Sequence, residues 1–135
     1  MRQLVFLLLL AAVEAADLPV IQPQDAAAAL AASRKPVVLY VGFNVLYRSK
    51  HIPGAVYAGP AGRPEGLELL KKSVANLAKD RDIFLYCGCC PWDKCPNIRP
   101  AVEMLTGMGF TRVKAIHLPQ DFKFDWIDKG YPVEN

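Results

Sequence analysis

Short apolar runs separated by segments of helical character constrain the fold of this chain most strongly. Residues 36–41 and residues 82–86 are runs of this kind, rich in valine, leucine, isoleucine and aromatic side chains. Such runs predict strands that are buried on both faces of a sheet. Between them, residues 64–79 carry Leu70 and Val74 on one apolar stripe at helical spacing. The alternation predicts an α/β sandwich with a mainly parallel central sheet and helices on both faces.

The other expected elements are shorter. They are an extended entry at residues 19–21, a helix over 25–32, a turn and short strand over 51–57, a helix from Ile98 or Pro100 to Met108, a strand over 113–117 and a last helix over 121–129. Residues 42–50 show no clear period and are assigned to no element. We see no internal repeat and no linker, so we expect one domain over residues 17–135.

Residues 1–15 are predicted to be a signal peptide. Arg2 gives a positive start, residues 5–13 form an apolar run, and Val13-Glu14-Ala15 with the next alanine forms a small-residue cleavage site, where we expect cleavage after Ala15 or Ala16. The run is shorter than the roughly 20 residues of a spanning helix, which argues against an uncleaved anchor. We therefore expect an exported protein, periplasmic or secreted, with no stable membrane insertion after removal of the signal.

The charge pattern limits the partners. The formal net charge is +3, and lysines and arginines are interspersed with acidic residues instead of forming a basic tract. This argues against nucleic-acid binding. A mildly basic surface suits small anionic substrates.

All four cysteines lie within residues 87–95, directly after the strand predicted at 82–86 and before the helix predicted from Ile98 or Pro100. Ligands of parallel α/β sheets bind at the carboxyl ends of the strands. Backbone N–H groups at a helix start favour thiolates and attract anions. The cluster is therefore a candidate site for sulfur chemistry, for a disulfide or for a metal ion.

Four segments, in this order, resemble motifs of the rhodanese-like sulfurtransferase family. They are His-Ile-Pro-Gly-Ala at 51–55, Ile-Phe-Leu-Tyr-Cys at 83–87, the segment 105–113 with Gly109-Phe110, and the segment 126–133 that begins with Trp126 and ends in Pro-Val. The resemblance implies a rhodanese-like three-layer sandwich. It also implies that Cys87 accepts a sulfane sulfur as a persulfide and passes it to a thiophile.

The resemblance further implies a substrate site and partners. Backbone amides after Cys87, beginning at Gly88, would cradle an anionic sulfur donor, and Arg99 resembles an arginine that assists them. Lys94 borders the same loop and is a further substrate-binding candidate. The expected partners are a small anionic sulfur donor and a thiol or other thiophilic acceptor, and no cofactor is expected.

The sequence also departs from the family pattern. Eleven residues separate Cys87 from Arg99, a longer loop than is usual in the family. Tyr40-Val41-Gly42 replaces the acidic and basic pair of the family's second strand, and Pro119-Gln120 replaces the glycine pair usual after the fifth strand.

The remaining cysteines leave three alternatives open. Cys87 and Cys90 have the spacing of a redox dithiol, and Cys95 could form a local disulfide with Cys90 or Cys89. Four thiolates could also hold zinc, copper(I) or an iron–sulfur cluster. We rank disulfide or redox exchange first because the predicted export places the chain in an oxidising compartment. Metal binding ranks last, so no metal is expected; Cys87, Cys89, Cys90 and Cys95 would be its ligands.

The neighbours of the cluster are interpreted conservatively. Trp92 is expected to anchor the loop by packing, Asp93 to point outward, and His51 to stabilise its turn, while His117 is a candidate neighbour of the cysteines. The leading function is sulfur transfer through Cys87. The alternatives are a thiol–disulfide redox protein and a non-catalytic metal- or partner-binding module.

Overall fold

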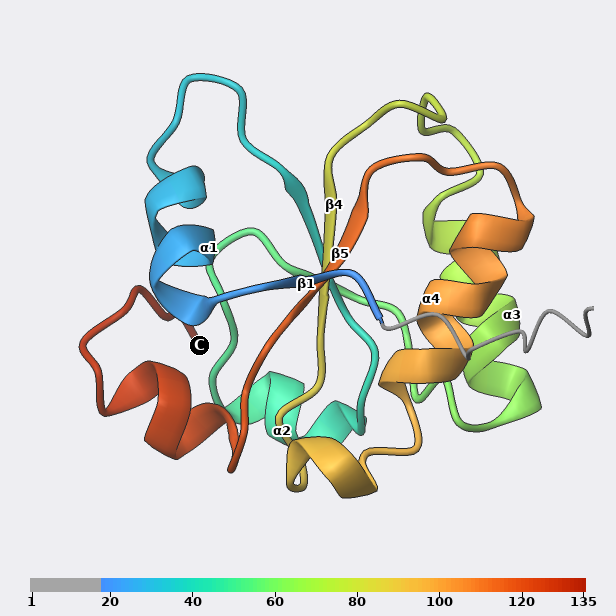
Figure 1. Ribbon diagram of the computed structural model, residues 1–135. Coiled ribbons are helices and arrows are strands. Elements are labelled where there is room, and N and C mark those ends of the chain that lie inside the picture. The colour runs from blue at the N-terminus through green and yellow to red at the C-terminus, as the bar shows by residue number, and fades with distance from the viewer. Residues whose placement is uncertain (1–17) are drawn as a thin grey trace, which may run out of the picture.

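The computed structural model describes residues 18–135; the predicted signal peptide and its cleavage site at Ala15 or Ala16 lie outside this range. Five parallel strands form one central sheet in the order β1-β5-β4-β2-β3, and helices cover both faces (Figure 1). The strands are β1 (Val20–Ile21), β2 (Val37–Tyr40), β3 (Val56–Tyr57), β4 (Ile83–Tyr86) and β5 (Val113–Ile116). The predicted α/β sandwich with a parallel sheet is confirmed.

The central strand β4 explains why the apolar runs determine the sheet. All four of its residues are buried, and it pairs with β2 on one side and β5 on the other. Leu85 lies opposite Leu39 of β2 and Ala115 of β5. A strand surrounded in this way must be apolar on both faces, which is the pattern that the sequence shows.

The helices form the two outer layers. Helices α3 (Pro64–Ser73) and α4 (Ile98–Gly107) lie on one face, and α1 (Pro23–Leu30), α2 (Asn44–Ser49) and the π-helix η2 (Lys123–Ile127) lie on the other (Figure 1). Alternate strand residues supply the two cores: Leu39 and Leu85 face α3 and α4, whereas Tyr40 and Tyr86 face the opposite layer. This alternation follows from the two-residue period of strands.

Helix α3 is shorter than the sequence predicts. It ends at Ser73 and not at residue 79. The Ser73 hydroxyl donates a hydrogen bond of 2.7 Å to the Leu69 carbonyl, a side-chain bond that competes with the helical pattern. Val74 and Leu77 nevertheless pack against the core, so the apolar stripe continues beyond the helix as turns.

Helix α2 is not predicted, because it lacks a buried face. None of its residues is buried, and Val45 is 73% exposed. Helix α2 follows β2 at the carboxyl edge of the sheet, where the cysteine loop and its short 3-10 helix η1 (Trp92–Lys94) follow β4 (Figure 1). Within residues 18–135, every helix is too short or too polar to span a membrane.

Candidate active site

Cys87 lies at the carboxyl end of the central strand and is 2% exposed. The chain turns immediately afterwards at Gly88, whose φ is +68°, in the left-handed region. A Cβ at Gly88 would lie 2.6 Å from Cβ of Phe122. Only glycine accepts both the backbone angle and this close approach. Gly88 therefore folds the loop back so that the next cysteines face Cys87.

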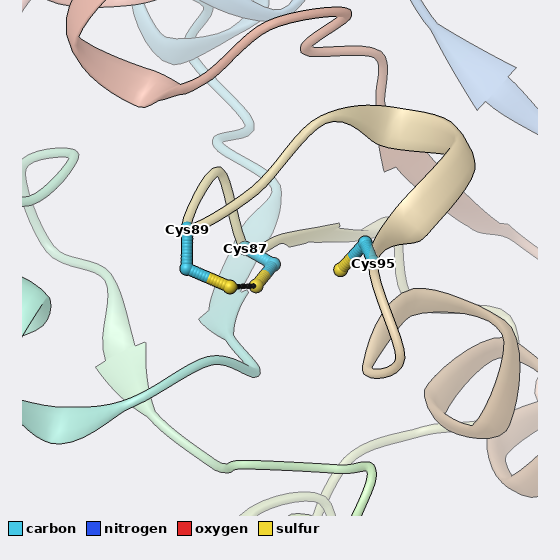
Figure 2. A group of neighbouring side chains, drawn as sticks. All are labelled: Cys87, Cys89 and Cys95. Atoms are coloured by element: carbon cyan, nitrogen blue, oxygen red, sulfur yellow. Dashed lines mark hydrogen bonds between the residues drawn. The ribbon is translucent and has the colours of Figure 1, made fainter.

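Three sulfur atoms meet in this loop. Figure 2 shows the side chains of Cys87 and Cys89 pointing toward one another, with Cys95 approaching them from the far end of the loop. The Cys87 and Cys89 Sγ atoms are 2.9 Å apart, and the three Sγ atoms lie within 4.8 Å of one another. Cys90 lies 3.5 Å from Cys89, sulfur to sulfur. All four cysteines are free thiols, so the predicted disulfides of Cys95 with Cys90 or Cys89 are not formed in this structure.

Cys95 is the sulfur closest to the start of a helix. Hydrogen bonds from the Cys87 and Cys89 thiols, together with the backbone N–H groups of Asn97 and Ile98, lower the pKa of Cys95 to about 2. The surroundings of Cys95 therefore favour its thiolate form. We expected the backbone donors of the helix start to stabilise a thiolate at Cys87, and the structure directs them instead to Cys95, the last cysteine of the loop.

The other sulfurs are held as thiols. A hydrogen bond with Cys89 lowers the pKa of Cys87, but the bond to Cys95 and burial outweigh it and raise that pKa to about 12. Hydrogen bonds to Cys87 and Cys95, and then burial, raise the pKa of Cys89. Burial also raises the pKa of Cys90 to about 12. The cluster thus combines one thiolate with neighbouring thiols that donate to it.

Asn97 is a site residue that the sequence analysis missed. It is 1% exposed, and its side-chain NH₂ donates to Cys87 Sγ at 3.4 Å and to Cys89 Sγ at 3.9 Å. Its carbonyl oxygen accepts a 2.8 Å bond from the Gly62 N–H. A buried amide with both ends occupied is fixed in orientation. The position of Asn97 just before α4, two residues after Cys95, was the available signal.

A second neighbour of Cys87 comes from the end of β2. A Cβ at Gly42 would lie 2.8 Å from Cys87 Sγ and 2.7 Å from the Tyr40 hydroxyl oxygen. Burial, then the nearby cysteines Cys87 and Cys89, raise the pKa of Tyr40, so this hydroxyl stays protonated and donates to the Phe43 carbonyl at 2.8 Å. The Tyr40-Val41-Gly42 segment, which replaces a charged pair of the family, therefore provides room for the sulfur.

A cavity of about 450 Å³ opens beside Cys87, Gly88 and Cys89. Its walls come from α2 and from the segment around η2, and include Leu46, Phe122 and Ile127. Two lysines, Lys50 and Lys123, also line it, and Lys123 is paired with Asp128 at 2.9 Å. Asp121 lines the cavity as well, so the cavity joins an apolar wall to charged groups of both signs beside the sulfur cluster.

The predicted substrate-binding side chains are placed elsewhere. Arg99 is exposed and lines a smaller cavity of about 220 Å³ next to Cys95, together with Trp92 and Asp93. Lys94 is exposed on η1 and lines neither of these cavities. The structure brings Gly88 to the large cavity and puts Arg99 on the Cys95 side. A role of Arg99 or Lys94 in binding stays a prediction.

The aromatic and histidine neighbours agree with the conservative interpretation. Trp92 packs edge-on against His117, with ring centroids 4.9 Å apart, and so anchors the loop to the segment after β5. His51 is bonded to the Tyr47 carbonyl at 2.8 Å and to Glu134 at 3.2 Å, far from any role in sulfur chemistry. Its turn supports the site indirectly, because the Ile52 N–H donates to the Tyr86 hydroxyl at 3.1 Å.

The trio of Cys87, Cys89 and Cys95 is the one group within residues 18–135 that brings three metal-ligating side chains together. Two thiolates on one tetrahedral zinc ion lie about 3.7 Å apart, given Zn–S bonds of about 2.3 Å. The 2.9 Å separation of Cys87 and Cys89 is too short for that arrangement. The geometry as it stands favours exchange between sulfurs over joint ligation of a metal ion.

Solved structures with the same fold are found among rhodanese-like domains. The Rhodanese_3-like domain of the Alr3790 protein from Anabaena sp. is 26% identical, with a TM-score of 0.56, over 74% of this chain and 99% of that one. The solution structure of a rhodanese-like domain of the same Anabaena protein gives 22% identity and a TM-score of 0.66 over 87% and 79% of the two chains. The BH2092 protein of Bacillus halodurans gives 20% identity and a TM-score of 0.66 over 87% and 77%.

Sequence comparison alone does not identify a family for this chain. No protein-family model matches this chain, and no curated protein gives a significant match. The structural likenesses confirm the fold that the order of the four motifs predicts.

Proposed function

Because this chain is a rhodanese-like domain, we propose that it is a sulfurtransferase that carries sulfane sulfur as a persulfide on Cys87. One observation carries the proposal: Cys87 ends the central strand and lines the 450 Å³ cavity, in contact with a thiolate-bearing cluster. A persulfide formed there has room in the cavity. It also has donors nearby, since the Asn97 NH₂ lies 3.4 Å from Cys87 Sγ.

The chemistry begins with a small anionic donor such as thiosulfate. Cys87 attacks the outer sulfur of the donor, the S–S bond of the donor breaks, and sulfite leaves with the bonding electrons. The Cys87 proton passes to the cluster, where Cys95, whose pKa is lowered, lies within 4.8 Å and accepts it. A thiol or another thiophilic acceptor then removes the sulfane sulfur.

The Lys50 ammonium group supports the proposal that the sulfur donor is an anion, because Lys50 lines the cavity that leads to Cys87. The Cys87 thiol itself is nearly buried, so the donor must enter this cavity to reach it. Lys123 lines the same space but is already paired with Asp128. Lys50 is therefore the cation that we assign to donor binding.

The test measures thiocyanate formed from thiosulfate and cyanide by the reduced protein. We expect a Cys87→Ser variant to lose activity by about a thousandfold or more, since a hydroxyl at this position is a poor sulfur nucleophile. Circular dichroism and thermal unfolding serve as the control that the variant is folded. Activity that is absent from the native protein, or that survives in the folded Cys87→Ser variant, contradicts the proposal.

The second candidate is a thiol–disulfide redox protein, favoured by the 2.9 Å approach of the Cys87 and Cys89 sulfurs. Its signature is the reduction potential of the dithiol, measured by equilibration with glutathione or dithiothreitol buffers. Catalytic disulfides lie above about −300 mV, the level below which structural disulfides are found. A dithiol in the catalytic range without any thiocyanate formation favours this candidate.

A further inference from the structure

The Cys87 and Cys89 sulfurs are arranged as partners in an exchange reaction. Their 2.9 Å separation exceeds the length of a disulfide S–S bond by only about 0.9 Å. Gly88, with its left-handed φ of +68°, turns both side chains to the same side of the loop (Figure 2). Both residues also line the same 450 Å³ cavity.

We propose that Cys89 reduces the Cys87 persulfide, so that the sulfane sulfur leaves as hydrogen sulfide and a Cys87–Cys89 disulfide remains. This inference rests on the proposed function, because it begins from the persulfide on Cys87. It makes the protein a sulfide-releasing enzyme whose second product is an internal disulfide, in place of a simple carrier between two substrates.

The step balances within the site. The Cys89 sulfur attacks Cys87 Sγ, the bond from Cys87 Sγ to the sulfane sulfur breaks, and the bonding electrons leave with the sulfane sulfur. The Cys89 sulfur is oxidised from thiol level to disulfide level, Cys87 Sγ is already at that level in the persulfide and stays there, and the sulfane sulfur is reduced to sulfide. The Cys89 proton and the persulfide proton leave with the sulfide as H₂S. No further oxidant or reductant enters this step.

Distance selects Cys89 as the resolving thiol. Cys90 Sγ is hydrogen-bonded to Cys89 Sγ at 3.5 Å, and Cys90 has no hydrogen bond to Cys87. Cys95 completes the trio within 4.8 Å but is held at the other end of the loop. Its sulfur lies within 4.8 Å of the Cys89 sulfur and its pKa is lowered, so it serves as the first acceptor for the Cys89 proton. Cys95 therefore assists the attack as a proton acceptor.

The site also allows the disulfide to be reopened. Cys87 is 2% exposed, whereas Cys89 is half-buried and faces the cavity. An external dithiol can therefore attack the Cys89 sulfur, form a mixed disulfide, and then close to its own disulfide, which returns two electrons to the pair. The co-substrate of a full cycle is a dithiol reductant, and a monothiol serves less well because it lacks the second attacking sulfur.

The experiment is a single turnover with thiosulfate under anaerobic conditions. The native protein is reduced, freed of reductant and mixed with thiosulfate; sulfite, sulfide and intact mass are then measured. We expect one sulfite and one sulfide per chain, with a mass lower by two hydrogens. Sulfite reports persulfide formation, and sulfide reports its reduction, so the two proposals fail separately.

Two variants localise the reaction. Cys89→Ser should still release one sulfite but retain one extra sulfur on Cys87 and release at least about tenfold less sulfide. Cys90→Ser should still release sulfide and form the Cys87–Cys89 disulfide, mapped by peptide mass. No sulfite from the native protein overturns the proposed function itself. Sulfite without sulfide, sulfide that persists in Cys89→Ser, or a mapped disulfide between any other pair overturns this inference alone.

Discussion

Cys87 and Cys95 stand at the two ends of one loop, and their surroundings shift their acidity in opposite directions. Cys87 follows a buried strand, is nearly inaccessible, and has its pKa raised to about 12. Cys95 precedes a helix, receives backbone hydrogen bonds, and has its pKa lowered to about 2. The comparison shows how one loop can store negative charge on one sulfur while presenting another to a cavity. The predictions below change each end in turn.

The Cys87 end of the loop, which follows the strand, should tolerate substitution less well than the Cys95 end. Gly88→Ala would add a Cβ 2.6 Å from Phe122 Cβ at a φ of +68°. We expect a loss of about 2–4 kcal/mol in the free energy of unfolding, from the left-handed angle and from overpacking. Urea denaturation measures it. The matched control is Gly107→Ala, where an added Cβ meets nothing within 4 Å; it should stabilise α4 by about 0.5–1 kcal/mol. Equal stability of the two variants contradicts the account of Gly88.

The helix end should control the pH dependence of thiol reactivity. Because the pKa of Cys95 is lowered, the thiolate is already present at pH 5, and alkylation by iodoacetamide should change little between pH 5 and pH 7. In Cys95→Ser, ordinary thiols remain, and the rate should rise about tenfold per pH unit, about a hundredfold over the interval. Peptide mass mapping identifies the alkylated residue. A tenfold rise per unit in the native protein would show that no thiolate is held at Cys95.

Asn97 touches both ends of the loop, so a charge introduced at this position tests how the loop stabilises its sulfur atoms. Asn97→Asp keeps an acceptor for the Gly62 N–H but replaces the NH₂ donor 3.4 Å from Cys87 with a carboxylate oxygen. A like charge there opposes thiolate and persulfide, and we expect sulfur transfer to fall about tenfold. Asn97→Ala leaves the Gly62 N–H unpaired and should lower the free energy of unfolding by about 1–3 kcal/mol, and Asn97→Asp should be destabilised as well because its carboxylate is buried. Full activity in Asn97→Asp would remove Asn97 from the site.

The smallest effect tests which side of the loop admits the donor. Lys50 lines the cavity beside Cys87, and Arg99 lines the one beside Cys95. We expect Lys50→Gln to raise the KM for thiosulfate about two- to fivefold with little change in kcat, the scale of one exposed charge. Arg99→Gln should change KM less. The reverse order would restore Arg99, the residue indicated by the family resemblance, as the binding cation.

The strands were predictable because burial on both faces leaves little freedom in sequence. Residues 36–41 and 82–86 contain β2 and β4 for this reason. Helix α2 was not predictable in the same way, because Val45 and Leu46 are exposed and impose no period. Hydrophobic periodicity in a sequence reveals a helix or strand only when one face of that helix or strand is buried.

The sequence predicted where the candidate site lies, but it did not predict which side chains meet within it. The end of β4 identified Cys87, since ligands meet at the carboxyl edge of a parallel sheet. The pairing of Cys87 with Cys89, in place of the Cys87 and Cys90 spacing of a redox dithiol, depends on the turn at Gly88. Lys50, one of the two lysines of the cavity, follows the end of α2 and reaches the site only through tertiary packing.

Trp92 is a fluorescent side chain within the cysteine loop. It is half-buried, packs on His117, and shares a small space with Cys87, Cys90 and Cys95. Trp126, the only other tryptophan in the chain, is fully buried and donates its indole N–H to the Pro132 carbonyl at 2.8 Å, in the layer across the sheet. Fluorescence from Trp92 therefore originates beside the sulfur atoms, whereas Trp126 reports on the opposite core. Sulfur loading and release become visible in real time, without a label.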